Sequence, residues 1–596
     1  MRIPTIPRPR TVWPWRSPRQ SLRNGSVQLV VLALLVGAGA GLGAIVFRSL
    51  ISWGTRLFTG TSDYAATTGH PAHPWLPWLG AGFIVLAPAI GGLLYGPLID
   101  RFAREARGHG VPEVMYAVTQ RGGRIPGKVA VVKALASAIT IGSGGSVGRE
   151  GPIVQIGSAL GSTLGRWARM PESRLRTLVA CGAAGGIAAT FNAPIAGVFF
   201  ALELLLGDFA ATSFGAVVLS AVTAAVVGRS VLGDEPFLRL AVFSVSSPWE
   251  YLLYALLGVV AAIVGVLFTK VLYGTEDLAD RIWRGPEWLR PGVGGLLLGL
   301  LLLALPQLYG VGYPVLEGGI TGKYVVGFLL LLLVGKILAT SITIAIGGSG
   351  GVFAPSLFLG AMLGSAFGQI VQHYAPGLGI HPGAYALVAM GAVFAGATRA
   401  PITAVIILFE LTGEYSIILP LMLAVVTAAG ISRKLSADTI YTAKLRRRGV
   451  DVTNRPNTDA LAGITVRSVM TPPPSSLPTD LAAEAAARRL LATGRRALPV
   501  ASRHGEFVGI LTSTAVAGAL AGDADADDVT VSRLVEMPAV VDPDMSIEDT
   551  LDAMLGDDAI AGLPVVDSNG TLVGWLRQDA VLRAITATRS IAKSAP

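Results

Sequence analysis

The sequence contains a single cysteine, Cys181, which excludes a disulfide framework, a thiolate metal centre and paired-cysteine redox chemistry. Histidine is scarce too, with six residues, and the two close neighbours, His70 and His73, fall in a Gly-His-Pro-Ala-His-Pro loop rather than on a helical ligand face. Charged residues make up 14% of the chain, against about 25% in soluble proteins. Because 52% of the 596 residues are hydrophobic, the composition excludes an ordinary soluble enzyme and indicates a polytopic membrane protein.

The two ends of the apolar region carry excess positive charge. Residues 1–27 hold six arginines and no acidic residue, and they lack the direct step into an apolar core that a signal peptide requires, so we expect a basic cytoplasmic tail. The run Arg446, Arg447 and Arg448 follows the last apolar segment, which places the C-terminal side in the cytoplasm as well. Both ends on one side imply an even number of complete crossings. We expect an integral protein of the plasma (inner) membrane.

Between residues 28 and 445, apolar runs recur, but many are too short to cross about 30 Å of hydrocarbon. The 74 glycines of the chain interrupt many of these runs. Short, glycine-interrupted runs are typical of broken or half-crossing helices.

The membrane region contains an internal duplication. An offset of 203 residues pairs Lys133 with Lys336 and Gly148 with Gly351, and an offset of 207 later pairs Ala193-Pro194-Ile195 with Ala400-Pro401-Ile402. The repeats span about 28–231 and 249–432. Duplicated halves are typical of transporters that bind their substrate near the midplane, where interrupted helices meet. Similarity alone leaves open whether the halves are parallel or inverted.

Three glycine-rich stretches end in a proline just before an apolar helical run: Gly108-His109-Gly110-Val111-Pro112, Gly148-Arg149-Glu150-Gly151-Pro152 and Gly351-Val352-Phe353-Ala354-Pro355. Proline in the first turn of a helix leaves unpaired N–H groups at the helix start, and with the helix dipole these groups form an anion site. The alternative is close helix packing, which we favour only for Gly157 and Gly161. No stretch ends in the Gly-Lys-Ser/Thr of a phosphate loop, which argues against a nucleotide-driven pump.

Acidic and basic residues inside this apolar region are candidates for function. A carboxylate such as Glu150 is costly there and marks a functional site, so we expect it to occupy the anion site as a tethered anion and to leave when protonated. The alternative is an ion pair between Arg149 and Glu150 at a water-facing edge. Glu203 and Glu410 occupy matching positions in the two repeats, which favours a structural role at least equally. Lys133 is either structural or the source of a positive field along the path.

These motifs closely resemble the CLC family of chloride channels and proton-coupled chloride exchangers, over residues 27–445. The resemblance implies an all-α polytopic membrane domain of tilted and broken helices in inverted repeats. It also implies a homodimer in the lipid bilayer with one path per subunit for chloride or a similar small anion, and Glu150 as its gate. The anion-binding residues that it implies are His109, Gly110, Arg149, Gly151, Val352, Phe353 and Tyr441.

Two positions depart from the family pattern. His109 stands where serine is usual; a neutral imidazole donates one hydrogen bond and a protonated one adds charge, so chloride is expected, with pH-sensitive or altered selectivity as an alternative. Leu204 stands where coupled exchangers carry a second, proton-accepting glutamate. Leucine carries no proton, which favours channel-like conduction over an exchanger that uses another proton route. A membrane enzyme or metal-ion transporter is a remote third reading, because no suitable pair of carboxylates or histidines is evident.

The C-terminal part has ordinary charge density and repeats at an offset of 65, pairing Leu498-Pro499-Val500 with Leu563-Pro564-Val565. After a polar linker, residues 446–463, it resembles a small α/β pair of tandem CBS domains, 464–522 and 529–588, within a region 464–590. In the usual nucleotide-binding segment Ala515 replaces an aspartate and Arg577 a hydroxyl residue. We therefore expect a cytoplasmic dimerising or gate-modulating module, with an adenine nucleotide as the only cofactor candidate and neither a metal nor a nucleic acid as partner.

Overall fold

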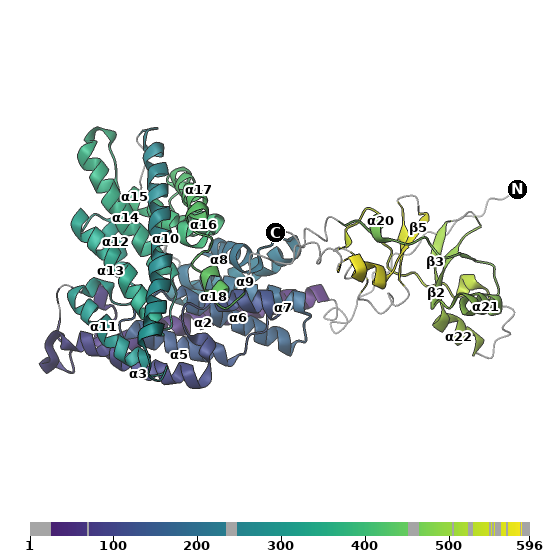
Figure 1. The fold of residues 1–596 in the computed structure, drawn as a ribbon, viewed down its shortest axis with the longest axis horizontal. Coiled ribbons are helices and arrows are strands. Elements are labelled where there is room, and N and C mark those ends of the chain that lie inside the picture. The colour runs from purple at the N-terminus through teal and green to yellow at the C-terminus, as the bar shows by residue number, and fades with distance from the viewer. Residues whose placement is uncertain are drawn as a thin grey trace. The chain divides into compact units, whose positions relative to one another are not determined.

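The computed structural model describes residues 25–67, 69, 71–233, 247–450, 464–503, 506–521, 529–547, 550, 554, 562–567, 570–584 and 586. Most of the expected basic tail, His70 and most of the expected linker lie outside these residues. The chain forms two compact units, Met1–Val452 and Thr453–Pro596. Figure 1 shows the first unit in purple to green and the second in yellow-green to yellow.

The first unit is built of helices. Its first half contains α2 (Gly25–Thr59), α3 (Phe83–Phe102), α4 (Val111–Gln120), α5 (Lys128–Gly142), α6 (Glu150–Trp167), α7 (Glu172–Phe191), α8 (Pro194–Phe200), a π-helical turn (Ala201–Leu206) and α9 (Ala211–Leu232). Its second half contains α10 (Glu250–Ile282), α11 (Arg290–Ala304), α12 (Tyr313–Ile320), α13 (Val326–Ala345), α14 (Phe353–Tyr374), α15 (Pro382–Thr398), α16 (Pro401–Thr412), α17 (Ile418–Leu435) and α18 (Thr442–Arg447). Short 3-10 turns occupy Tyr64–Ala66, Pro77–Gly82, Arg104–Ala106, Pro306–Leu308 and Pro376–Leu378.

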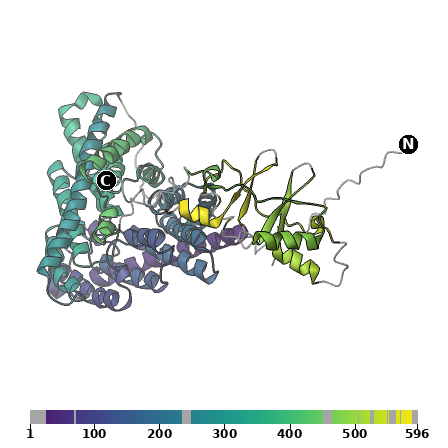
Figure 2. The same cartoon turned by 45° about the vertical axis from the view of Figure 1, so that its right-hand side comes forward.

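This unit contains both long and short helices (Figure 2). Among the described residues, seven helices are long and apolar enough to cross a membrane. Other helices are short, such as α8 with 7 residues and α12 with 8. Several end at a glycine-rich turn that leads into the next helix, so the expected all-α fold of broken helices is confirmed.

The duplication is visible in the backbone as well as in the sequence. Helix α7 ends at Asn192 with φ 57°, and its counterpart α15 ends at Arg399 with φ 56°. Both residues lie in the left-handed region, which non-glycine residues rarely adopt and which often closes a helix. A proline begins the next helix in each half, Pro194 in α8 and Pro401 in α16. The two halves therefore share local geometry that similarity of sequence only suggests.

Glu203 and Glu410 each stabilise the helix start of the opposite half. Glu203 accepts hydrogen bonds from Ile402 N at 3.1 Å, Thr403 N at 2.8 Å and Thr403 Oγ1 at 2.6 Å, at the start of α16. Glu410 accepts from Ile195 N at 3.0 Å and Ala196 N at 2.6 Å, at the start of α8. A carboxylate at a helix N-terminus satisfies free N–H groups and the dipole. The structural reading of these two glutamates is thus the one that the contacts support.

The second unit contains two related β-α modules. The first holds β1 (Leu477–Pro478), α21 (Ala483–Thr493), β2 (Ala497–Ala501), β3 (Phe507–Thr512), α22 (Ser513–Leu520) and a 3-10 turn (Val531–Arg533), and the second holds α20 (Val466–Val469), β4 (Leu563–Val566) and β5 (Leu572–Leu576). Strands β2 and β3 pair antiparallel, as do β4 and β5, while β1 and β2 pair parallel. Trp575, 1% exposed, joins the modules by packing with Ala497 and Ile510.

Candidate functional site: converging glycine-rich turns

The glycine-rich turns of the two halves meet in the centre of the first unit. Gly148 N donates to Gly351 O at 2.7 Å, and Gly351 N donates to Gly148 O at 2.6 Å, so these equivalent residues form an antiparallel bridge. The first turn joins them, because Gly108 N donates to Gly348 O at 3.1 Å and Gly350 N donates to Gly108 O at 3.3 Å. Equivalent segments thus run in opposite directions, as in inverted repeats.

Each proline-ended turn begins a helix, as predicted. Helix α4 begins at Val111, α6 at Glu150 and α14 at Phe353. The turns approach so closely that only glycine fits: a Cβ on Gly110, whose φ is 79°, would lie 2.7 Å from Gly151 O, and one on Gly151 would collide with His109 O. Three helix N-termini therefore converge on one buried region, where their N–H groups and dipoles favour an anion.

A fourth turn completes the arrangement, and it escaped the motif search. Gly310-Val311-Gly312-Tyr313-Pro314 begins α12 and has the same Gly-x-Gly-x-Pro spacing as Gly108 to Pro112. This spacing is the signal that could have revealed it as the counterpart of the first turn.

Two buried lysines hold these paired turns. Lys133 Nζ donates to Ala106 O at 2.9 Å and Gly108 O at 2.7 Å. Its counterpart, Lys336 Nζ, donates to Gly310 O and Val311 O, both at 3.1 Å. Both side chains are 0% exposed. These hydrogen bonds support a structural role for Lys133. Its charge also lies next to the first turn.

Glu150 extends from the first half to the second. Its Oε1 accepts a hydrogen bond from Tyr313 Oη at 2.7 Å, and its Oε2 lies 3.4 Å from Ala354 N, in the first turn of α14. Val352 and Phe353, which precede Ala354, are buried with it. Glu150 is 2% exposed, so it does not lie at a water-facing edge, and that alternative from the sequence is wrong.

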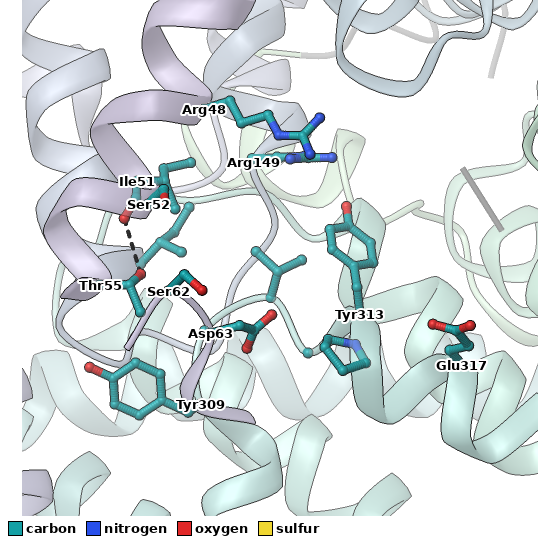
Figure 3. A pocket seen from close by; sticks show the side chains of 15 residues that line it. Arg48, Ile51, Ser52, Thr55, Ser62, Asp63, Arg149, Tyr309, Tyr313 and Glu317 are labelled. Atoms are coloured by element: carbon teal, nitrogen blue, oxygen red, sulfur yellow. Dashed lines mark hydrogen bonds between the residues drawn. The ribbon is translucent and has the colours of Figure 1, made fainter. Parts of the chain in front are cut away.

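A cavity of about 360 Å³, which we call the vestibule, is lined in part by Tyr313, whose hydroxyl donates to this carboxylate. Its lining includes Arg48, Ser52, Thr55, Ser62, Asp63, Arg149, Tyr309, Tyr313 and Glu317. In Figure 3 the side chains of Arg48 and Arg149 lie together, with the Tyr313 hydroxyl pointing towards them and Asp63 at a distance. Burial raises the pKa of the Asp63 carboxyl, against the opposing effect of the Ala65 and Ala66 N–H groups.

Hydrogen bonding assigns a tautomer to His109. Tyr273 donates its only proton to Ile440 O at 2.6 Å, so His109 Nε2, 3.1 Å from Tyr273 Oη, must be the donor in that contact. In the neutral ring Nδ1 then carries a lone pair, and among the described residues this buried atom has no hydrogen-bond partner. The one donor of a neutral imidazole, which we expected to serve an anion, is thus engaged by Tyr273.

Tyr441 is 1% exposed and directly precedes α18, and the adjacent Ile440 N donates to Ala397 O at 2.9 Å. Lys444, three residues on, is a further cation that sequence reasoning missed. Its Nζ lies 4.0 Å from Glu276 Oε1, and a Cβ on Gly108 would lie 2.6 Å from it. The first turn therefore faces two buried ammonium groups, those of Lys133 and Lys444.

Comparison with known proteins identifies this arrangement. A family model described as "Voltage gated chloride channel" matches residues 91–433, and a model of the CBS domain matches residues 466–522 and 529–587. The chain belongs to the voltage gated chloride channel family. The expected resemblance to CLC proteins with a tandem CBS pair is thereby confirmed.

Individual members of the family are similar over most of the membrane unit. The chain is 34% identical over 432 residues to "Putative chloride channel protein ClcB-like" of Ralstonia nicotianae, covering 72% of this chain and 99% of that protein. It is 36% identical over 427 residues to "H(+)/Cl(-) exchange transporter ClcA" of Vibrio cholerae, covering 70% and 89%. The solved structure of a slow cyanobacterial Cl-/H+ antiporter superimposes with a TM-score of 0.63 at 26% identity, covering 70% and 97%.

Leu204 has an apolar environment in this member of the family. It lies in the π-helical turn, is 9% exposed and belongs to the main hydrophobic core. The neighbouring Glu203 binds the start of α16, so its carboxylate is already engaged. Within the part of the chain that the structure describes, no group of three His, Cys, Asp or Glu side chains is placed to hold a metal ion.

Proposed function

We propose that this protein carries chloride or a similar small anion across a membrane, through one path in each subunit of a homodimer, with Glu150 as the gate. The observation that supports this proposal is the place of the Glu150 carboxylate. It lies at the N-terminus of α14, 3.4 Å from Ala354 N, where the helix dipole favours a negative group. The carboxylate thus stands where a bound anion would be stabilised, and the two compete for one site.

The converging turns supply the remaining contacts along the path. The backbone N–H groups near Val352 and Phe353, with the Tyr441 hydroxyl, form the central position. His109 and Gly110 line one side, next to Lys133, and Arg149 and Gly151 line the side nearest the vestibule. The charges of Lys133 and Arg149 attract anions to the path. Most contacts along the path come from backbone partial charges, so a bound anion can leave again.

Protonation is the step that opens the gate. A neutral Glu150 loses its attraction to the α14 N-terminus and leaves the position to an incoming anion. The basic segment before α2 marks the cytoplasmic side by the positive-inside rule, so the vestibule, which is lined by Arg48, Ser52 and Thr55 near the other end of α2, faces outwards. Protons then reach Glu150 from the outside.

Leu204 favours conduction without tight proton coupling, because no proton acceptor stands at that position. A second candidate, chloride/proton exchange through another proton route, is favoured by relatives whose names describe exchangers. The two differ in one measurement. With equal chloride on both sides of a reconstituted bilayer and a pH gradient across it, the reversal potential stays at zero for a channel. For an exchanger it shifts away from zero.

The gate assignment is tested separately by Glu150→Gln, which keeps the size of the side chain and removes its charge. We expect anion flux from proteoliposomes to become independent of external pH and to remain high at neutral pH. Flux that keeps the wild-type pH dependence would show that another group is the gate.

The remaining organisation is proposed from the same relationship. Residues 28–445 form the transport domain, and 464–522 and 529–588 form a cytoplasmic regulatory pair after the linker 446–463. Both termini lie in the cytoplasm, and the protein resides in the plasma (inner) membrane. Cysteine-scanning with a membrane-impermeant reagent at exposed positions of each unit tests these sides directly.

A further inference from the structure

Tyr313 is the residue that connects the vestibule with the Glu150 carboxylate. It opens α12, and its half-buried ring lines the vestibule. The Tyr313 hydroxyl, at the tip of the side chain, donates to Glu150 Oε1 at 2.7 Å. No motif pointed to this residue, and the proposed anion contacts do not use it.

The ring of Tyr313 is itself held in place. The guanidinium carbon of Arg149 lies 5.2 Å from the centre of the Tyr313 ring and 5.7 Å from the ring of Phe191. A guanidinium over an aromatic face at this distance is a cation–π contact. Pro314 follows Tyr313 in the first turn of the helix and fixes the backbone there. The hydroxyl is therefore aimed at Glu150 by groups on both sides of the ring.

We propose that Tyr313 is a latch for the gate: its hydroxyl holds the ionised Glu150 carboxylate on the anion site and lets it go when the carboxylate is protonated. This proposal rests on the gate assigned to Glu150 above. Hydrogen bonds to an ionised acceptor are roughly twice as strong as those to a neutral one, so the contact favours the closed, charged state. Tyr313 is thus a positioning residue that sets how much external acid is needed to open the path.

Other charged and titratable groups face the same carboxylate. They are Arg149 on its own segment, Lys336 on α13 and Tyr441 before α18, while Arg48 on α2 and Asp63 reach the vestibule. Tyr313→Phe leaves all of these side chains in place and keeps the cation–π contact between the ring and Arg149. It removes the contacts of the Tyr313 hydroxyl, which are those to Glu150 and to the Arg149 side chain.

The chain offers a matched control in Tyr309. This tyrosine also lines the vestibule, but its hydroxyl donates to Gly142 O at 2.8 Å and not to Glu150. Tyr309→Phe thus removes a buried hydroxyl from the same cavity without touching the gate. Any general loss of packing or stability appears in both variants, and thermal unfolding of each purified variant measures it.

The experiment is anion efflux from proteoliposomes, measured against external pH for the wild type, Tyr313→Phe, Tyr309→Phe and Glu150→Gln. Without the hydrogen bond that favours the ionised carboxylate, protonation of Glu150 requires less acid. We expect the pH of half-maximal efflux to move up by about one unit or more in Tyr313→Phe and to stay unchanged in Tyr309→Phe.

The outcomes separate the latch from the gate. If Tyr313→Phe titrates like the wild type while Glu150→Gln is independent of pH, the latch is wrong and the gate stands. If Tyr309→Phe shifts as far as Tyr313→Phe, the effect belongs to the cavity and the latch is again wrong. If Glu150→Gln keeps the wild-type pH dependence, the gate and the latch fall together.

Discussion

Replacing Glu203 with alanine removes three hydrogen bonds from the start of α16, two of them to backbone N–H groups and one to the Thr403 hydroxyl. Replacing Glu410 removes two from the start of α8. Loss of a helix cap costs about 0.5 to 2 kcal/mol, and a hydrogen bond to a charged group contributes about 1.5 to 3 kcal/mol. Both carboxylates are only partly buried, which lowers these values.

We therefore expect Glu203→Ala to lower the free energy of unfolding by about 2 to 3 kcal/mol and Glu410→Ala by about 1 to 2 kcal/mol. The order of the two effects follows from the additional Thr403 hydroxyl. Thermal unfolding of the detergent-solubilised protein measures both. Glu172→Ala is the control, because Glu172 forms an exposed ion pair with Arg176 in the first turn of α7 and its loss should change stability by less than about 1 kcal/mol.

Glutamine variants at the same two positions distinguish a structural role from a role in proton transfer. If Glu203 is a cap, Glu203→Gln keeps an acceptor oxygen, retains part of the stability and leaves the proton coupling of transport unchanged. Glu203 is not a helix cap if Glu203→Ala unfolds like the wild type, or if Glu203→Gln abolishes a proton flux that Glu410→Gln leaves intact.

Three further predictions concern individual side chains. In His109→Ser the hydroxyl is free of the Tyr273 contact, so chloride binding measured by calorimetry should become about tenfold tighter, the equivalent of about 1.4 kcal/mol; unchanged or weaker binding argues against the assigned tautomer. Tyr441→Phe should weaken chloride binding by a similar factor without a change in unfolding temperature, and binding equal to the wild type would remove Tyr441 from the site. Trp575→Ala should destabilise the second unit by about 3 to 5 kcal/mol while the first unit unfolds as before, and an unchanged transition would mean that Trp575 does not join the two modules.

The positions of the helix starts could be predicted from the sequence, because they depend on local chemistry. A proline that follows a glycine-rich stretch favours the first turn of a helix whatever the rest of the fold. The structure confirms a helix start at Pro112, Pro152 and Pro355. The internal duplication told us that related turns exist in both halves. It did not tell us that Gly148 and Gly351 pair with each other, because that contact joins residues far apart in the chain.

Side-chain partners were beyond the reach of sequence reasoning for the same reason. The Gly-x-Gly-x-Pro spacing around Tyr313 indicates a turn, but only the fold shows that the Tyr313 hydroxyl lies on Glu150. The engagement of His109 by Tyr273 depends on a third group, the carbonyl of Ile440, which takes the tyrosine proton. The roles of Glu203 and Glu410 stayed open until their partners, at the starts of α16 and α8, were known.

The proposed competition requires that the Glu150 carboxylate and a transported anion share one position, and bromide can show this directly. Crystals of Glu150→Gln grown in bromide should give an anomalous peak at the start of α14, within hydrogen-bonding distance of Ala354 N, that is absent or much weaker in the wild type at neutral pH. Bromide that binds only elsewhere in Glu150→Gln, or equally at this position in both proteins, would contradict the proposed competition.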